Sequence, residues 1–251
     1  MPTNYETERA FFDRVASQAS LAPINQATLE RYASPRWPHL FSKEMMFALA
    51  GDLKGKRVLE VGCGDGVTSV ELAYCGAQVS GIDISPCSID VARRRAALQG
   101  LDVKFHVENV VEAESLGEEI YDIVWCDAVL HHLVDSLEAV MNKIDRALKP
   151  GGMFIASEPI AYARWLKALR QLVPVRTDVT PDEQPFRDSE FAIVRKYFPD
   201  LQLRHFRILR RADCITTYLP VLRILGRVDN LLLRLPGTTA LAGNVVMWST
   251  K

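Results

Sequence analysis

The middle third of the chain alternates apolar runs with helical spacings, and this alternation constrains the fold more than any other feature. Parallel strands buried on both faces appear as continuous apolar runs, whereas helices repeat apolar residues at three- and four-residue intervals. Strands are predicted at residues 57–61, 78–82, 103–107, 121–125 and 151–156, and helices at 68–74, 88–98 and 137–148. The pattern indicates an α/β fold, a doubly wound parallel sheet with right-handed crossovers and helices on both faces.

The flanking segments extend this organisation. Ser85, followed by Pro86, has the residue types of a helix start, and the run from Lys149 to Gly152 ends one helix before the next strand. Outside the middle third, the spacing predicts helices at 8–19, 41–50 and 189–198 and strands at 202–209 and 244–250. The N-terminal helices either cover the ligand cleft or pack against the sheet edge, and the sequence does not favour one of these two roles.

Composition excludes several classes of function. Thirty Lys and Arg balance 31 Asp and Glu, so no global positive field would attract nucleic acid, and a small-molecule substrate is favoured. Five cysteines without a C-x-x-C pair predict reduced thiols and no metal site. The first 20 residues lack the basic start and apolar run of a signal peptide, which predicts a cytoplasmic protein. Residues 215–235 are apolar but interrupted by charges and Pro220, so they could lie at a membrane surface without spanning it.

A glycine-rich turn follows the first predicted strand. Residues 58–66 read Val-Leu-Glu-Val-Gly-Cys-Gly-Asp-Gly, and glycines in such a turn let a ligand approach the backbone closely. A dinucleotide-binding fold requires G-x-G-x-x-G, whereas Val67 follows a G-x-G-x-G run here. This spacing disfavours a nicotinamide-dependent oxidoreductase.

The charges around this turn favour a cationic nucleoside. Glu60 and Asp65 flank the turn and would repel a pyrophosphate, but they would attract an ammonium or a sulfonium group. Asp83 ends the second strand 21 residues after Gly62, where a carboxylate can accept both hydroxyl groups of a ribose. An adenosine with free ribose hydroxyls and a cationic tail satisfies all three observations.

With these residues the chain resembles the class I S-adenosylmethionine-dependent methyltransferases that modify small molecules. The resemblance covers residues 54–159 and has four landmarks: the turn at 58–66, Asp83, the strand from Asp122 to Val124 that leads to the 130–133 segment Leu-His-His-Leu, and the 148–152 segment Leu-Lys-Pro-Gly-Gly. It implies S-adenosyl-L-methionine as cofactor and a Rossmann-like sheet of seven mostly parallel strands, the last antiparallel. It also implies a single methyltransferase domain over 1–251: a helical cap (1–53), a cofactor-binding core (54–158), and substrate-side insertions with C-terminal strands (159–251).

The resemblance assigns cofactor contacts residue by residue. The methionine end would be held by Glu60, Gly62, Cys63 and Gly64, the ribose by Asp83 with Ile84, and the adenine edge by Asn109 with Val110, while Asp127 would line the site. Many relatives carry Asp where this chain has Asn109. An asparagine side chain offers the adenine both a donor and an acceptor.

Methyl transfer from a sulfonium is an in-line displacement that mainly requires alignment and removal of water, and a general base is needed only if the acceptor must lose a proton. His131 and His132 are the candidate bases, with helix capping or packing under the cofactor as the alternative. Glu158 could orient a polar acceptor or anchor a loop. Trp37, His39, Tyr162 and Trp165 could line an apolar or aromatic substrate pocket or belong to the core.

Three functions remain open from the sequence. The first is methylation of an oxygen, nitrogen or carbon atom of a small, lipophilic or aromatic metabolite. The second is a catalytically inactive S-adenosylmethionine-binding partner or sensor, and the third is the disfavoured oxidoreductase. Arginines crowd residues 204–234, which is typical of a solvated edge but would also suit an anionic substrate.

Overall fold

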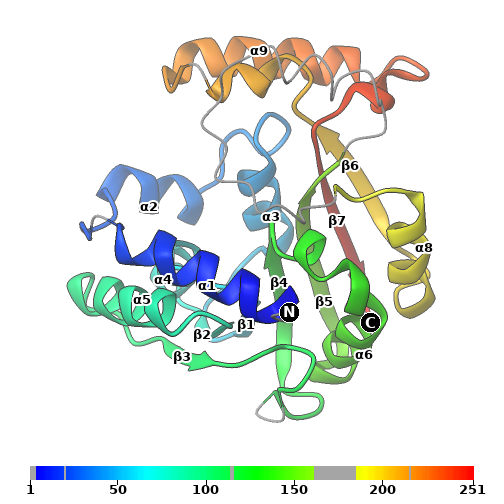
Figure 1. The fold of residues 1–251 in the computed structure, drawn as a ribbon. Helices are drawn as coiled ribbons and strands as arrows, with labels where there is room; N and C mark the ends of the chain where they lie inside the picture. The colour runs from blue at the N-terminus through cyan, green and yellow to red at the C-terminus, as the bar shows by residue number, and fades with distance from the viewer. Residues whose placement is uncertain (1–3, 20, 114–115, 161–184, 215) are drawn as a thin grey trace.

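The computed structural model describes residues 4–19, 21–113, 116–160, 185–214 and 216–251. Figure 1 shows a central sheet with helices on both sides and α9 at one end. The seven strands are β1 (Arg57–Val61), β2 (Gln78–Asp83), β3 (Lys104–Val107), β4 (Tyr121–Asp127), β5 (Leu148–Pro159), β6 (Gln202–Phe206) and β7 (Asn244–Thr250).

These strands form one sheet in the order β3-β2-β1-β4-β5-β7-β6. The pairs among β1 to β5 are all parallel, whereas β7 runs antiparallel to both β5 and β6. The prediction of a mostly parallel, seven-stranded, doubly wound sheet with an antiparallel last strand is confirmed. The strand order reverses between β1 and β4, and ligands of open α/β sheets bind outside the strand ends at such a switch point.

Helices cover both faces of the sheet and a further layer lies outside them. One face carries α3 (Ser42–Ala50), α4 (Val67–Tyr74) and α5 (Pro86–Leu98), and the other carries α6 (Leu137–Ala147) and α8 (Asp188–Tyr197). Helix α1 (Asn4–Ser17) packs on α5, α2 (Gln26–Ala33) packs on α4, and α9 (Leu219–Leu232) packs on a 3-10 segment (Leu209–Cys214).

The core explains why the strands are continuous apolar runs. In β4 the side chains of Ile123 and Trp125 enter the cluster on the α3 and α4 side, while Val124 and Cys126 enter the cluster on the α6 and α8 side. All four are at most 1% exposed, as expected for a strand buried on both faces. The sheet is therefore a rigid support for the loops at its strand ends.

Local details depart from the predicted boundaries. Helix α2 was not predicted, and its eight residues lie between Pro23 and Pro35. Asn25 caps it by accepting the Ala27 N–H. The predicted strand at 202–209 ends at Phe206, where Arg207 takes a φ of 66°. The predicted start of α5 is confirmed, because the Ser85 side chain accepts the Ser88 N–H and Pro86 occupies the first turn.

Within the described ranges, no helix has the length and apolar character needed to cross a bilayer.

Candidate active site

The glycine-rich turn joins β1 to α4 in backbone conformations that favour glycine. Gly62, Gly64 and Gly66 have φ values of 68°, 50° and 78°. A Cβ on Gly62 would lie 2.3 Å from a methyl carbon of Val129, whereas a Cβ on Gly64 would meet no atom within 4 Å. Gly62 thus allows the loop after β4 to pack closely, and Gly64 leaves backbone open to a ligand. Cys63 is 5% exposed and its sulfur packs against Gly81, so only its backbone can face a ligand.

Asp83 stands at the carboxyl end of β2, beside this turn. Its Oδ2 accepts the Gly64 N–H at 2.9 Å and its Oδ1 accepts the Ser85 N–H at 2.9 Å. Burial raises the pKa of Asp83, against the effect of these two backbone donors. Each carboxylate oxygen retains a second acceptor position, so the side chain can still bind a pair of ribose hydroxyls. Ile84 follows it and is partly buried.

A cluster of three carboxyl groups and one ammonium lies under the turn. Glu60 is 3% exposed and accepts a hydrogen bond from Ser69, and burial raises its pKa to about 8. The Lys43 ammonium lies 2.6 Å from an oxygen of Glu71, and burial likewise raises the pKa of Glu71 and of Asp127.

Lys43 balances part of this cluster. Burial alone would lower the pKa of the Lys43 ammonium, but the nearby Glu71 and Asp127 carboxylates hold it above its ordinary value. One cation faces three acidic groups, so the fully ionised cluster would be two charges negative. Such a cluster favours a ligand that brings positive charge.

Asp65 does not contribute to this acidic environment as predicted. Its carboxylate lies 2.6 Å from the Arg95 guanidinium, which also donates to the Asp65 carbonyl oxygen at 2.9 Å. Arg95 comes from α5, 30 residues further along the chain. The expectation that Asp65 repels a pyrophosphate is therefore wrong, because its charge is already paired. The acidic character of the site comes from Glu60, Glu71 and Asp127 instead.

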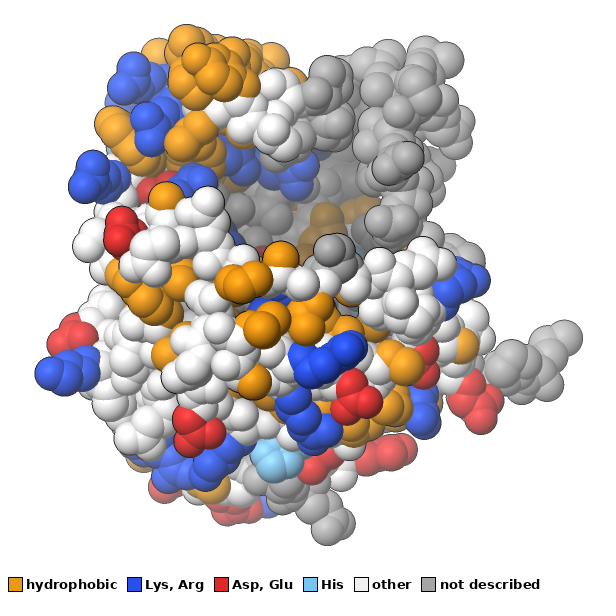
Figure 2. Space-filling model, turned by 90° about the vertical axis from the view of Figure 1, so that its left-hand side faces the viewer, with side chains coloured by type: hydrophobic (Ala, Val, Ile, Leu, Met, Phe, Trp, Pro, Cys, Tyr) orange, Lys and Arg blue, Asp and Glu red, His pale blue; other side chains and the backbone are white. Residues whose placement is uncertain are grey.

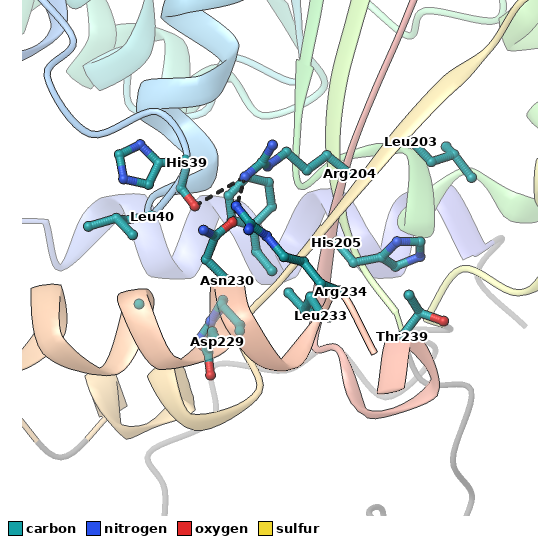
Figure 3. Close-up of a pocket in the computed structure, with 13 residues that line it drawn as sticks. His39, Leu40, Leu203, Arg204, His205, Asp229, Asn230, Leu233, Arg234 and Thr239 are labelled. Atoms are coloured by element: carbon teal, nitrogen blue, oxygen red, sulfur yellow. Dashed lines mark hydrogen bonds between the residues drawn. The ribbon is translucent and has the colours of Figure 1, made fainter. Parts of the chain in front are cut away.

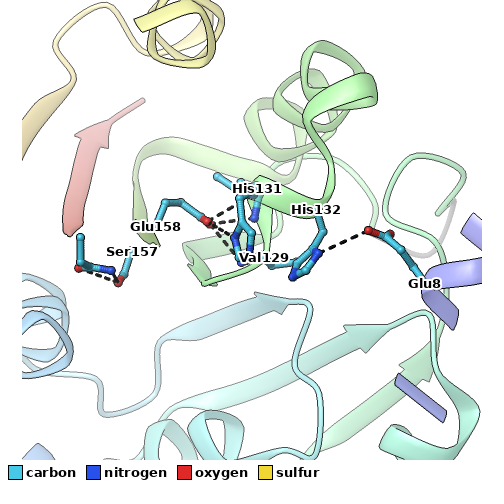
Figure 4. A network of polar contacts seen from close by, with 8 residues as sticks. Glu8, Val129, His131, His132, Ser157 and Glu158 are labelled. Carbon is cyan, nitrogen blue, oxygen red and sulfur yellow. Dashed lines mark hydrogen bonds and ion pairs between the residues drawn. The ribbon is translucent and has the colours of Figure 1, made fainter. Parts of the chain in front are cut away.

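The loop after β4 is held by the carboxylate of Glu158, at the end of β5 (Figure 4). Glu158 is fully buried and accepts the backbone N–H groups of Val129, Leu130 and His131 at 3.1, 2.8 and 3.3 Å. Its Oε2 also lies 2.7 Å from Nδ1 of His131, a side chain that is 5% exposed. Loop anchoring, the alternative to contact with a substrate, accounts for all of these interactions.

His132 points to the other side, toward the N-terminal helix α1. Its Nδ1 lies 3.4 Å from Oε1 of Glu8, and its ring meets Phe12 edge to face with centroids 5.4 Å apart. The rings of His131 and His132 are themselves 4.0 Å apart. One turn further along α1, Asp13 accepts a 2.6 Å hydrogen bond from Ser85. Helix α1 thus bridges the loops after β2 and β4 and lies beside the predicted ribose position, which favours the cleft-covering role.

Asn109 lies just beyond β3. Its side-chain oxygen accepts the Val111 N–H at 3.0 Å, and its backbone oxygen accepts the N–H groups of Glu112 and Ala113. The side-chain oxygen thus shapes the turn, and the amide nitrogen can donate to a ligand. Val110 is 4% exposed and belongs to the core cluster on the α6 side.

The predicted substrate residues do not form one group. Trp37 packs with Leu40 and Phe41, and the guanidinium groups of Arg223 and Arg227 lie 5.2 and 5.8 Å from its ring. His39 lines a cavity of about 260 Å³ between β6 and α9, which contains none of the predicted cofactor residues (Figure 3). Tyr162 and Trp165 lie outside the described residues.

Several site residues carry no signal in the sequence. Lys43, Glu8 and Asp13 belong to N-terminal helices with ordinary amphipathic patterns, and they reach the site only because α3 packs on β5 and α1 packs on α5. Arg95 is one of three consecutive arginines on α5, and nothing local distinguishes the one that binds Asp65.

The glycine turn, the Asp83 carboxylate and the buried acidic cluster meet at the switch point of the sheet, an arrangement that suits a nucleoside-binding α/β protein. Residues 52–187, more than half of the chain, match the family model described as "Methyltransferase domain". The chain therefore belongs to the class I S-adenosylmethionine-dependent methyltransferases, a family whose methyl donor is S-adenosylmethionine.

Curated relatives and solved structures agree with this assignment. The chain is 33% identical over 141 residues to the ubiquinone biosynthesis O-methyltransferase of Aeromonas salmonicida, covering 55% of this chain and 59% of the relative. It is 40% identical over 103 residues to the enzyme of the same name from Bordetella bronchiseptica, covering 41% and 42%. The chain thus spans about half the length of the curated relatives it matches.

The structural likeness extends over the whole chain. Geranyl diphosphate C-methyltransferase from Streptomyces coelicolor, solved with geranyl diphosphate, Mg²⁺ and S-adenosyl-L-homocysteine, superposes with a TM-score of 0.64. The alignment covers 99% of this chain and 98% of that one at 13% identity. Magnesium protoporphyrin IX methyltransferase from Synechocystis gives 0.57 at 17% identity, covering 99% and 100%. At these identities the likeness concerns the fold alone.

Proposed function

We propose that this chain transfers the methyl group of S-adenosylmethionine to an oxygen, nitrogen or carbon atom of a small lipophilic or aromatic metabolite, with a hydroxyl group as the first acceptor to test. The observation that carries the proposal is the acidic floor beside an open glycine turn and Asp83, because it suits a nucleoside with a cationic tail. The hydroxyl is favoured by the names of the curated relatives, which are O-methyltransferases.

Each predicted cofactor residue would bind a different part of the methyl donor. The ammonium and sulfonium of the donor would lie over Glu60 and Asp127, whose carboxyl groups gain stability in the ionised form when a cation approaches. Asp83 would accept the ribose hydroxyls, in charge-assisted bonds worth roughly 1.5 to 3 kcal/mol each. Asn109 would donate from its amide nitrogen to the adenine edge, with the backbone of Val110 beside it.

When bound, the donor supplies an activated methyl group, so this chain's residues need only align the acceptor, exclude water and remove its proton. The pair of Glu158 and His131 suits proton removal. A carboxylate 2.7 Å from Nδ1 holds the proton on that nitrogen and leaves the basic lone pair on Nε2. The same Glu158 carboxylate also accepts backbone N–H groups of the loop that carries the imidazole. These contacts help to set the orientation of the imidazole.

The acceptor pocket is proposed at the strand ends near this loop. His132 is its candidate wall among the described residues, whereas Trp37 and His39 lie apart from it, near α9 and β6. Tyr162 and Trp165 extend the hypothesis to a segment outside the described residues. A lipophilic or aromatic acceptor would suit such rings.

The test is a screen of cell extracts with isotopically labelled S-adenosylmethionine, followed by identification of the labelled product. A labelled small molecule that depends on the protein supports the proposal. Tight binding of S-adenosylhomocysteine without methyl transfer to any extract component would contradict it and would instead support the inactive binding protein.

The base is tested with His131→Ala once an acceptor is known. We expect a loss of turnover of about 10² to 10⁴ with little change in S-adenosylhomocysteine affinity. His106→Ala, at an exposed position on β3, is the matched control. Unchanged turnover of His131→Ala across the pH range would refute the role of the imidazole and leave alignment as the main contribution.

A further inference from the structure

Helix α9 carries a row of exposed apolar side chains that the methyltransferase function does not use. Their spacing of three and four residues aligns them along one side of the helix. The row consists of Val221, Ile224, Val228, Leu231 and, just beyond the helix, Leu235, which are 38, 59, 37, 61 and 55% exposed. Large apolar side chains are normally scattered singly over a surface, whereas a contiguous row marks a contact surface.

Contacts on the opposite side of α9 hold the helix so that the apolar row faces outward. Gly226 lies against Leu40, with its α-carbon so close that an added Cβ would be 3.2 Å from the leucine Cβ. Asp229 is 4% exposed and accepts the backbone N–H groups of Ile208, Leu209 and Arg210 at 3.1, 2.7 and 3.0 Å. A helix held in this way cannot turn its apolar row inward without breaking three hydrogen bonds to a buried carboxylate.

Positive charge borders the row. Arg227 on α9 and Arg234 just beyond it are exposed and, seven residues apart, lie on the same side next to the apolar row, whereas the half-buried Arg223 stacks on Trp37. The single acidic residue in the sequence from 216 to 243 is Asp229, which is buried under the helix. The exposed part of this segment therefore presents apolar and cationic groups together. Figure 2 shows hydrophobic and basic side chains side by side at the top of the molecule, over α9.

This charge pattern indicates which kind of partner binds the apolar row. Two copies of α9 packed against each other would bring these arginines together without exposed carboxylates from this segment to pair with them. An anionic lipid surface avoids that repulsion, because apolar side chains can enter the acyl boundary while arginines reach up to the phosphates. Since no described helix can cross a bilayer, such binding would be peripheral.

We propose that α9 lies in the interface of an anionic lipid bilayer, with the row from Val221 to Leu235 inserted and Arg227 and Arg234 at the level of the headgroups. Figure 1 shows α9 beyond the carboxyl ends of the parallel strands, the same end of the sheet that carries the candidate active site. A bound molecule would therefore hold this end of the sheet toward the lipid. The inference stands on α9 alone and does not depend on the proposed methyl transfer.

The experiment is co-sedimentation of the full chain with vesicles of phosphatidylcholine alone or with about 30% phosphatidylglycerol. We expect binding to the anionic vesicles that falls as salt is raised, and little binding to the neutral ones. The double variant Ile224→Gln and Leu231→Gln should weaken partitioning at least tenfold, and the double variant Arg227→Gln and Arg234→Gln should remove the preference for anionic vesicles.

The control is Leu98→Gln, which changes a leucine of α5 that is 52% exposed and should bind vesicles like the unmodified chain. Thermal unfolding and S-adenosylhomocysteine affinity of each variant test folding and the cofactor site separately, and both should be unchanged. The proposal is overturned if the unmodified chain ignores anionic vesicles or binds neutral ones equally. It is also overturned if sedimentation equilibrium shows a dimer that the double variant at 224 and 231 abolishes, because the row would then be an interface between copies.

Discussion

Replacing Glu60 by glutamine should make the free protein markedly less sensitive to rising pH. The pKa of Glu60 is about 8 in the folded state and 4.5 in a model peptide, so between these values the folded state binds more protons than the unfolded state. Under this condition the free energy of unfolding falls as the pH rises. The full shift corresponds to about 5 kcal/mol, at 1.36 kcal/mol per pKa unit.

Nearly half of this loss in unfolding free energy falls between pH 6 and pH 8, where the protein can be assayed. Between pH 6 and pH 8 the linkage relation gives a decrease of about 2 kcal/mol in unfolding free energy from Glu60 alone. Glu60→Gln keeps the shape of the side chain and an acceptor for the Ser69 hydroxyl, but it has no proton to lose. The variant should therefore lack this decrease, while Lys43, Glu71 and Asp127 titrate in both proteins.

The assay is urea unfolding of the ligand-free protein at several pH values. Glu118→Gln, which changes an exposed glutamate paired with Arg146, serves as a control and should follow the unmodified chain. If the Glu60→Gln and unmodified proteins lose stability in parallel from pH 6 to 8, the pKa of Glu60 is not raised in the folded state and the linkage argument is refuted.

Three further substitutions probe the site. Asp83→Ala should weaken S-adenosylhomocysteine binding at least tenfold in titration calorimetry and leave the fold intact. The control Asp90→Ala, on the exposed side of α5, should have no effect. Equal affinities of the Asp83→Ala and unmodified proteins would refute the ribose assignment. Gly62→Ala should lower the free energy of unfolding by a few kcal/mol, because the new Cβ would lie 2.3 Å from a methyl carbon of Val129. Adding Val129→Ala should restore part of this free energy. If it restores none, the strain lies in the backbone at residue 62 instead. Lys43→Met should destabilise the protein by about 3 to 5 kcal/mol, because it leaves the buried carboxylate of Glu71 without its cation. A melting temperature within a degree or so of the unmodified chain would show that Glu71 is protonated.

Prediction from the sequence succeeded where the physics is local or periodic. The strands β1, β2 and β4 were recognisable because burial on both faces requires unbroken apolar runs, and the start of α5 because Ser85 and Pro86 satisfy a helix terminus by themselves. Helix α2 was missed because two prolines 12 positions apart leave room for a short helix as well as for a loop.

The sequence by itself determined the architecture and the position of the cofactor turn. Apolar periodicity selects the parallel sheet, and a sheet that reverses its strand order brings the ends of β1, β2 and β4 together whatever the loops contain. Glycines at 62, 64 and 66 and the carboxylate of Asp83 could therefore be read as one site, since strand and turn geometry alone bring them into proximity.

Only the tertiary structure decided the charges and the roles of individual side chains. The sequence predicts a free negative charge at Asp65, whereas the structure pairs it with Arg95. Lys43 reaches the site from a helix that precedes the first strand. Glu158 proved to hold three backbone N–H groups and an imidazole from a neighbouring loop. Ion pairs and hydrogen bonds depend on distances of a few ångströms between groups far apart in the chain, and no periodic pattern in a sequence encodes those distances.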